Sequence, residues 1–311
     1  MEKVESSSKR QKSDSFSLTF ECTSSLRTMV SVISELLQRA DFEVTMDEND
    51  GKKGYLSVES VDPKQVCLVL ARLSCSLKGH NGSPRFFVST SDLMTTLKSI
   101  PHHYQLDISS TDVSNLYLFA ADPICKSHEM SFKLNTLMQD EDPFNGKMND
   151  MDYDFTLEVD THTLRRFVRT TKELHGEDVL FKIEQPKKGG EGKKHTMLTL
   201  EAQGTTVELK ETFHSIIDDT RKDGSTVICT DHEERRDELE GGGEGGGEGV
   251  VEKEVIYKDS FGASYISSYL KHLDKHTLTI RLSEGKPLVL SFPLGSDHTK
   301  NYICLVLAPK V

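Results

Sequence analysis

One segment of this chain occurs twice. Residues 23–36 read TSSLRTMVSVISEL and residues 161–174 read THTLRRFVRTTKEL, an ungapped resemblance 138 residues apart. Each copy follows a stretch in which apolar and polar residues alternate, FSLTF at 16–20 and FTLEV at 155–159. Alternation is typical of strands, and the apolar residues of both copies recur at helical spacing. A strand-then-helix unit that occurs twice predicts two domains of one design.

Further strands and a second helix are expected in each half. Residues 91–100 and 262–276 have helical periodicity, and apolar strand-like runs surround them. We therefore expect an α+β fold of two similar domains, each with largely antiparallel sheets and two helices. Thr23 or Ser24 is expected to cap the first helix. The expected boundaries are a disordered tail at 1–14, a first domain at 15–122, a connecting loop at 123–152 and a second domain at 153–311.

The composition is that of a water-soluble protein long enough for two cores. No apolar run approaches the roughly 20 residues that cross a bilayer, so we expect no membrane contact. The N-terminus is not expected to be a secretory signal. The six cysteines form no CxxC pair, which favours reduced thiols in the cytosol or nucleus. The basic residues of the KRQK run at 9–12 are either a nuclear localisation signal or a solubilising terminus, and we expect a nuclear protein.

The net charge of −12 is concentrated in one segment. Residues 218–254 hold thirteen acidic and five basic residues, which leaves only about −4 for the rest of the chain. The segment includes EGGGEGGGEG at 240–249, a composition that buries too little apolar surface to become ordered. We expect an acidic, Gly-rich, disordered insertion at 218–254. Global charge is therefore a poor guide to the binding partner.

The second copy of the repeated segment is basic where the first is mostly neutral. Its apolar side holds Leu164, Phe167, Val168 and Thr171. The opposite side carries four cations at intervals of one to four residues: Arg165, Arg166, Arg169 and Lys172. Read alone, this face is either a solvated surface or a contact for a polyanion.

The closing residues resemble a known family. KPLVLSF at 286–292 and YICLVLAPK at 302–310 are similar to the C-terminus of proliferating cell nuclear antigen (PCNA), the eukaryotic sliding clamp. LSVESVD at 56–62, followed by VCLV at 66–69, looks like the strand, Ser-x-Asp turn and next strand of that family. Glu129–Leu134 resembles the start of its interdomain connecting loop. The resemblance runs from about Phe16 to Lys310 and indicates a divergent member, cellular or viral.

The resemblance implies a DNA clamp fold that assembles into a ring of three identical subunits. Helices would line a central hole around double-stranded DNA, which is held without regard to sequence. The ring would act as a processivity factor for a DNA polymerase, be placed by a clamp loader, and dock replication and DNA repair proteins. It would catalyse no reaction and need no cofactor. If viral, it would work in the host nucleus or at a viral replication site.

The resemblance also assigns DNA-binding residues: Arg165, Arg166, Arg169, Lys172, Arg27, Lys98, Lys271 and Lys275. Thr28, Ser34, Thr95 and Ser264 stand where clamps commonly carry cations, so roughly half of the expected inner charge is missing. This keeps two alternatives open, a subunit of a heteromeric checkpoint-type clamp and a monomeric polymerase accessory factor.

The clamp's hydrophobic pocket for short partner peptides maps to Val61, Gln65, Leu137, Met138, Pro287, Val306, Ala308 and Pro309. Gln65 stands where the family usually has His, and Val306 where it has an aromatic residue. Two strands, 116–119 and 197–200, are expected at sheet edges that pair between subunits.

An enzyme is the remaining class, and no constellation of residues supports it. The His102-His103 pair lacks metal-ligand spacing, and the Gly-rich repeats follow no strand and precede no Gly-Lys-Ser/Thr. We expect no catalytic residues, no metal and no cofactor.

Overall fold

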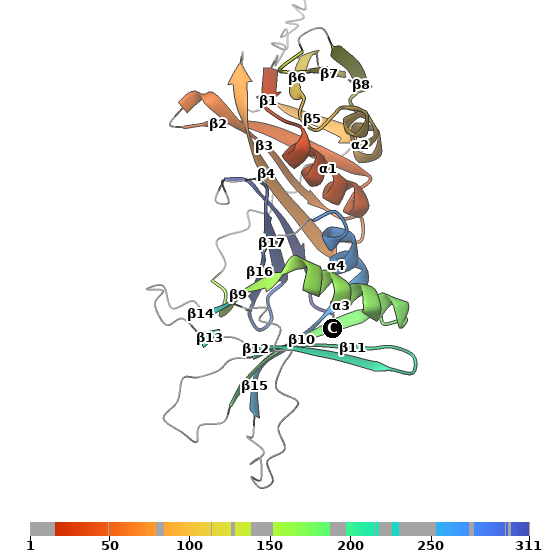
Figure 1. Cartoon of the computed structure of the whole chain (residues 1–311), viewed down its shortest axis with the longest axis vertical. Coiled ribbons are helices and arrows are strands. Elements are labelled where there is room, and N and C mark those ends of the chain that lie inside the picture. Colours follow the sequence, from red (N-terminus) through yellow and green to blue (C-terminus); the bar gives the residue numbers. More distant parts are fainter. Residues whose placement is uncertain are drawn as a thin grey trace, which may run out of the picture. The chain divides into compact units, whose positions relative to one another are not determined.

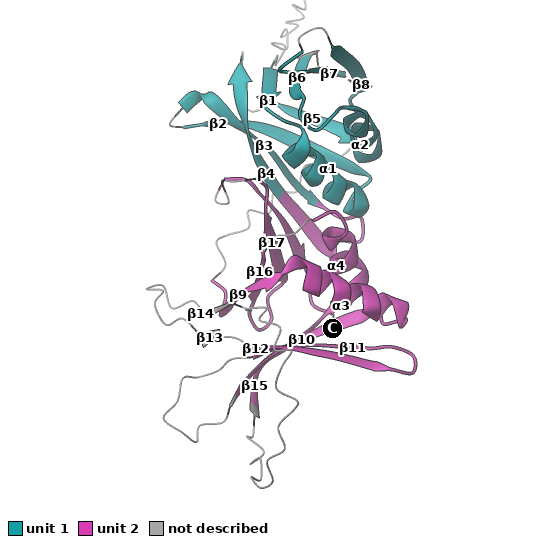
Figure 2. Cartoon of the chain, in the orientation of Figure 1, with its two compact units in different colours: residues 1–60, 71–143 teal, residues 61–70, 144–311 magenta. Residues whose placement is uncertain are grey.

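The structure is a computed structural model that describes most of the chain. The described residues are 16–48, 50–78, 84–112, 114–125, 128–137, 152–186, 197–214, 216–217, 226–229, 253–273, 277–295, 297 and 300–310. The expected tail at 1–14 and most of the expected insertion at 218–254 lie outside them. The chain forms two compact units, residues 1–60 with 71–143 and residues 61–70 with 144–311 (Figure 2).

Unit 1 combines antiparallel strands with two helices (Figure 1). Its strands follow the order β4-β1-β6-β7-β8, while β2 pairs with β3 and β5, and β3 pairs with β4. Residue 61 of β3 and residues 67–70 of β4 belong to unit 2. The elements are β1 (Phe16–Phe20), α1 (Ser24–Leu36), β2 (Arg39–Asp47), β3 (Asp50–Val61), β4 (Cys67–Lys78), β5 (Arg85–Ser89), α2 (Thr90–Ser99), β6 (Gln105–Asp112), β7 (Asn115–Ala121) and β8 (Glu129–Asn135).

Unit 2 repeats this design with one four-stranded antiparallel sheet, β12-β11-β10-β15, and a second sheet, β13-β14-β9-β16-β17-β18, which the start of β4 joins. The elements are β9 (Phe155–Asp160), α3 (Thr161–Glu173), β10 (Asp178–Pro186), β11 (Met197–Gln203), β12 (Glu208–His214), β13 (Ile216–Ile217), β14 (Thr226–Cys229), β15 (Lys253–Gly262), α4 (Ala263–Leu270), β16 (Thr277–Leu282), β17 (Leu288–Pro293) and β18 (Tyr302–Leu307). The predicted α+β class with antiparallel sheets and two helices per unit is confirmed.

The predicted periodicity places the core. In α1 the apolar residues at helical spacing, among them Leu26, Val30 and Ile33, are fully buried. In β7 the period of two buries Leu116 and Leu118 and exposes the residues between them.

Matched backbone hydrogen bonds show the duplication directly. The first N–H of α2, at Thr90, donates to the carbonyl of Gln38 just before β2 (3.1 Å). The first N–H of α4, at Ala263, donates to the carbonyl of Glu177 just before β10 (2.8 Å). A second pair matches as well: Leu137 donates to Phe87 (2.7 Å) and Lys310 donates to Ser260 (2.8 Å), each acceptor lying three residues before the second helix. The two units therefore share local geometry as well as element order.

Several expected elements differ from the structure. The last helix ends at Leu270 rather than at 276, and residues 274–276 lie outside the described part. Strands β2 and β5 were not predicted, although Ala40, Phe42 and Val44 alternate and are buried in β2. Residues 226–229 of the expected disordered insertion form β14, which pairs in parallel with β9. The apolar run TVIC explains this, because it gives that short stretch strand propensity within an acidic segment.

The expected edge strands are also wrong. Residues 116–119 lie in β7, which pairs with β6 on one side and β8 on the other. Residues 197–200 lie in β11, which has β10 and β12 as neighbours. Among the described strands, β8 and β12 end these two rows. The hairpin partner of each predicted edge covers it, which strand propensity alone does not reveal.

Candidate DNA-binding helices and partner surface

Helix α3 is anchored at its start and along one side. Asp160 caps it, because its carboxylate accepts hydrogen bonds from the backbone N–H (2.8 Å) and the hydroxyl (2.9 Å) of Thr163. Leu164, Phe167 and Val168 are buried, and α3 contacts α4, β9 and β10. The opposite side is therefore left to the cations.

The four cations of α3 differ in their surroundings. Arg166 pairs with Glu211 of β12 (Nη2–Oε1, 2.6 Å), and Arg169 pairs with Glu173 of its own helix (Nε–Oε1, 3.4 Å). Lys172 is exposed, whereas Arg165 is half-buried with a buried Nε that has no hydrogen-bond partner. Exposed ion pairs contribute at most about 1 kcal/mol, so Arg166 and Arg169 can exchange these partners for a phosphate at little cost.

Arg27 is engaged within unit 1. Its guanidinium donates to the carbonyls of Leu97 (2.7 Å) and Ile100 at the end of α2, and it contacts the imidazole of His102 (2.8 Å). Burial lowers the pKa of this guanidinium. A cation at a helix C-terminus is favourable, because it satisfies carbonyls that have no intrahelical partner. The expected DNA contact of Arg27 stays a prediction, and the structure gives this residue a second role.

The expected side-chain cap of α1 is absent, and Thr23 contacts the loop after α2 instead. The Thr23 hydroxyl makes no capping hydrogen bond and instead donates to the carbonyls of Pro101 (3.2 Å) and His102 (3.3 Å). The start of α1 and the loop after α2 are therefore tied together twice, through Thr23 and through Arg27.

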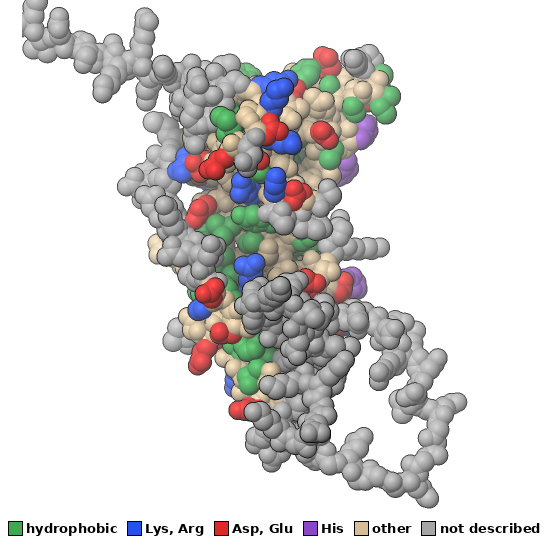
Figure 3. Space-filling view, turned by 90° about the vertical axis from the view of Figure 1, so that its left-hand side faces the viewer, with side chains coloured by type: hydrophobic (Ala, Val, Ile, Leu, Met, Phe, Trp, Pro, Cys, Tyr) green, Lys and Arg blue, Asp and Glu red, His purple; other side chains and the backbone are tan. Residues whose placement is uncertain are grey.

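The remaining predicted cations lie at helix ends. Lys98 is exposed in the last turn of α2, and Lys271 is exposed directly after α4. Lys275 lies outside the described residues. Figure 3 views the molecule from the left-hand side of Figure 1, and acidic, basic and apolar side chains are interspersed on the face that it shows.

Part of the predicted partner pocket is a cluster of apolar side chains in unit 2. Leu68, Val289 and Val306 are buried together, and Val61, Leu70, Tyr153 and Cys304 pack against them. We call these seven residues the apolar cluster. The structure thus brings together the predicted residues Val61 and Val306, which are 245 positions apart in the chain.

Tyr153 is a member of this cluster that the sequence analysis missed. Burial raises the pKa of its phenol, and its hydroxyl is buried without a hydrogen-bond partner. The ammonium of Lys286 lies 5.7 Å from the ring centroid and hydrogen-bonds the carbonyl of Asp152. An aromatic residue just before a predicted strand, inside an acidic polar stretch, was the signal available in the sequence.

A tight turn borders the apolar cluster. The carboxylate of Asp62 accepts hydrogen bonds from the N–H groups of Val66 (2.7 Å) and Cys67 (2.8 Å) and from the Tyr265 hydroxyl (2.9 Å). Burial disfavours the charged carboxylate, but these hydrogen bonds together outweigh it and lower the pKa of Asp62. Gln65 completes the turn with a left-handed backbone, φ 57°. The backbone N–H of the predicted residue Gln65 donates to the Asp62 carbonyl (2.8 Å), and its side chain is exposed.

The other predicted pocket residues are less enclosed. Ala308 is exposed, and its N–H donates to the Val66 carbonyl (3.0 Å). Pro287 and Pro309 are half-buried. Leu137 is half-buried in unit 1, and Met138 lies outside the described residues.

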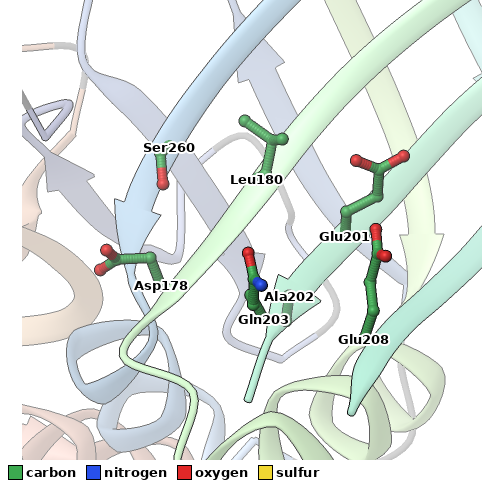
Figure 4. A pocket seen from close by; sticks show the side chains of 7 residues that line it. All are labelled: Asp178, Leu180, Glu201, Ala202, Gln203, Glu208 and Ser260. Atoms are coloured by element: carbon green, nitrogen blue, oxygen red, sulfur yellow. The ribbon is translucent and has the colours of Figure 1, made fainter. Parts of the chain in front are cut away.

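A hollow of about 170 Å³ opens on the four-stranded sheet of unit 2, with Leu180 and Ala202 among its lining residues (Figure 4). Its carboxylates have cations beside them. Glu201 binds Lys182 and Lys210, whose hydrogen bonds outweigh the effect of burial and lower the pKa of Glu201. Asp178 lies 2.5 Å from the Lys310 ammonium. Two of its acidic residues are thus neutralised from within the chain.

In the part of the chain that the structure describes, no group of three or more His, Cys, Asp or Glu side chains could hold a metal ion. No described helix is long and apolar enough to span a bilayer. Cys67 and Cys75 are buried and form no disulfide, and burial raises the pKa of each thiol to about 12.

Comparison with known proteins identifies the fold. No family model and no curated protein sequence matches the chain. A solved structure of PCNA from Thermococcus kodakaraensis does match, with a TM-score of 0.66 over 95% of this chain and 100% of that chain. The chain has the PCNA fold. The two sequences are 15% identical, so the likeness concerns the fold, and the PCNA-like architecture predicted from the C-terminal motifs is confirmed at that level.

Proposed function

We propose that this protein is a DNA sliding clamp, a ring that encircles double-stranded DNA and acts as a processivity factor for a DNA polymerase. The observation that carries the proposal is the PCNA fold of the whole chain combined with the basic face of α3. Phosphate contacts by Arg and Lys are independent of sequence, as movement along DNA requires. The DNA contacts would come from Arg165, Arg166, Arg169 and Lys172, assisted by Lys98, Lys271 and Lys275.

Three copies would form the ring by pairing β8 of one subunit with β12 of the next. Both strands end their rows among the described strands, and unpaired strand edges are adhesive. A head-to-tail contact between two different surfaces generates a closed ring when the rotation closes.

The apolar cluster would receive short peptide motifs of polymerases and of other replication and repair proteins. A partly exposed apolar surface beside a rigid turn suits an anchor residue of an extended or helical peptide. A clamp loader would open the ring, and the protein would work in the nucleus. No reaction and no cofactor belong to this function.

A primer-extension assay tests the proposal. Polymerase, loader and primed circular DNA are incubated with and without the protein, and product length is measured. Longer products at an unchanged number of extended primers are expected, since tethering reduces dissociation without changing the chemistry. Unchanged product length with a cognate loader and polymerase would refute the processivity role.

A second candidate keeps the fold but not the homotrimer. Arg27 is bound to carbonyls of its own unit, so α1 and α2 offer few free cations. A subunit of a heteromeric checkpoint-type clamp, or a monomeric polymerase accessory factor, would have less need of them. A molar mass of one chain at micromolar concentration would favour this alternative.

A further inference from the structure

Unit 1 contains a hollow of about 390 Å³ that the functions assigned so far leave unused. It lies where α1 ends and where β2 and α2 begin. Residues that line it are Ser34, Gln38, Arg39, Ser89, Ser91 and Leu137.

Arg39 is the distinctive residue of this hollow. Unit 1 has four described arginines, and three of them have partners. Arg27 binds carbonyls, Arg72 lies 3.7 Å from the Tyr55 ring centroid, and Arg85 pairs with Glu43 (3.3 Å). The exposed Arg39 side chain has no ion pair or hydrogen bond to any described residue. Its five N–H donors therefore have no partner among the described residues.

The duplication supplies an internal comparison. The matched hydrogen bonds of Gln38 and Glu177 make Arg39 equivalent to Asp178, since each is the first residue of the following strand. The same argument makes Leu137 equivalent to Lys310. In unit 2 these positions form the ion pair of Asp178 and Lys310, at the edge of the hollow in Figure 4. In unit 1 the equivalent positions hold a cation and an apolar residue, so the charge of Arg39 is not balanced there.

The donors of this hollow suit a phosphate. A guanidinium binds phosphate oxygens through two parallel hydrogen bonds. The hydroxyls of Ser89 and Ser91 lie 3.0 Å apart and share one hydrogen bond, which leaves one O–H to donate elsewhere. Gln38 adds an amide. The hydroxyls of Ser34 and Thr90 are already used, because they donate to the carbonyls of Ser31 and Leu37.

We propose that the hollow at Arg39 binds a backbone phosphate of duplex DNA. It would add a second DNA contact to unit 1, since Arg27 is engaged and Lys98 is the remaining basic residue of α1 and α2. The inference rests on the proposed function and names an additional DNA contact. A contact between these donors and a backbone phosphate does not depend on the base sequence, so it is compatible with sliding.

The experiment measures binding of the full-length protein to a labelled blunt duplex by fluorescence anisotropy over a series of salt concentrations. Arg39→Ala is compared with Lys52→Ala, which removes an exposed cation from β3 of the same unit. The Arg39 variant is expected to bind about 5-fold more weakly at low salt, and its slope of log K against log salt should fall by about 0.9. The Lys52 variant should match the wild type. Arg39→Lys should keep the slope and lose part of the affinity, because the charge remains while the planar fork is lost.

The outcomes separate the inference from the proposed function. If Arg39→Ala binds DNA like the wild type while Arg169→Glu binds weakly, the inference fails and the clamp proposal stands. If Arg39→Ala retains DNA binding but loses affinity for an acidic partner peptide, the hollow binds a carboxylate and the phosphate assignment is wrong. If the wild type shows no affinity for duplex at low salt, the proposed function fails and this inference fails with it.

Discussion

At the scale of single residues, the same residue type performs unlike tasks in this chain. Arg27 ties α1 to the end of α2, Arg166 forms an exposed ion pair with Glu211, and Arg39 lies beside a hollow without a partner among the described residues. A guanidinium with five donors supports all three roles, and the neighbours decide which one is realised. Charge counts on a helix are therefore a weak measure of its capacity to bind DNA.

Replacing Arg27 should affect stability more than DNA binding. Arg27→Ala leaves the carbonyls of Leu97 and Ile100 without their charged donor, which costs about 2 kcal/mol of unfolding free energy. Urea unfolding followed by circular dichroism measures this cost. Lys98→Ala is the control, because it removes an exposed cation of α2 and should leave the urea midpoint unchanged. Full stability of Arg27→Ala with weakened DNA binding would contradict the structural role.

The free energy of unfolding should depend on pH through the carboxylate of Asp62. Its folded pKa is lowered, so its contribution is complete above its unfolded pKa of about 3.9 and is lost as pH falls through the lower folded value. Asp62→Asn should cost about 1–3 kcal/mol at pH 7, since the amide cannot accept at both positions from the N–H groups and Tyr265. The difference between the two proteins should shrink below about pH 4. Denaturant titrations at pH 7 and pH 3 measure the free energy of unfolding of the wild type and of Asp62→Asn. The same difference between the two proteins at both pH values would contradict the prediction.

At the scale of elements, α3 combines a strong cap, a buried apolar side and a basic side within thirteen residues. Its cations hold only surface partners, whereas the cation of α1 is bound to backbone carbonyls. The two copies of the repeated segment therefore differ in the surroundings of their cations while keeping one packing design.

Charge reversal on α3 should weaken DNA binding without unfolding the protein. The double variant Arg169→Glu with Lys172→Glu changes exposed positions, so the thermal midpoint should shift little. Two lost phosphate contacts should lower the slope of log K against log salt by about 2. Anisotropy on duplex DNA measures this slope. The matched variant Lys52→Glu with Lys53→Glu in β3 changes the net charge equally and should keep the wild-type slope; equal loss in both variants would indicate a general charge effect.

At the scale of the whole molecule, β8 and β12 end two rows of the described strands, and in the proposed ring a second copy would cover them. The proposed assembly would therefore use strands that the sequence did not identify. It also places one partner strand in each unit, which a head-to-tail ring requires.

Disrupting β8 should dissociate the assembly. Ser131→Pro removes a backbone N–H from β8 and prevents regular pairing, whereas Ser131→Ala keeps that N–H. Light scattering should give about 105 kDa for the wild type and the alanine variant, and near 34.9 kDa for the proline variant. A wild-type mass of one chain would exclude the homotrimer and favour the accessory-factor alternative.

The sequence by itself determined the two-unit α+β design, most strands, the helix cores and the basic side of α3. These features follow from apolar periods of two and 3.6 residues, which depend only on near neighbours along the chain. The C-terminal motifs added the PCNA-like architecture, which the structural match confirms.

Only the tertiary structure decided which side chains and strand edges are left to contact another molecule. Arg27 meets carbonyls 70 and 73 positions away, Tyr153 meets Val306, and β8 rather than β7 ends its row. Each outcome depends on which distant residues become neighbours, and that information is absent from any local pattern. The repeated segment predicts two like helices, but long-range contacts determine that the arginine of one is bound to backbone carbonyls while three of the four cations of the other are exposed.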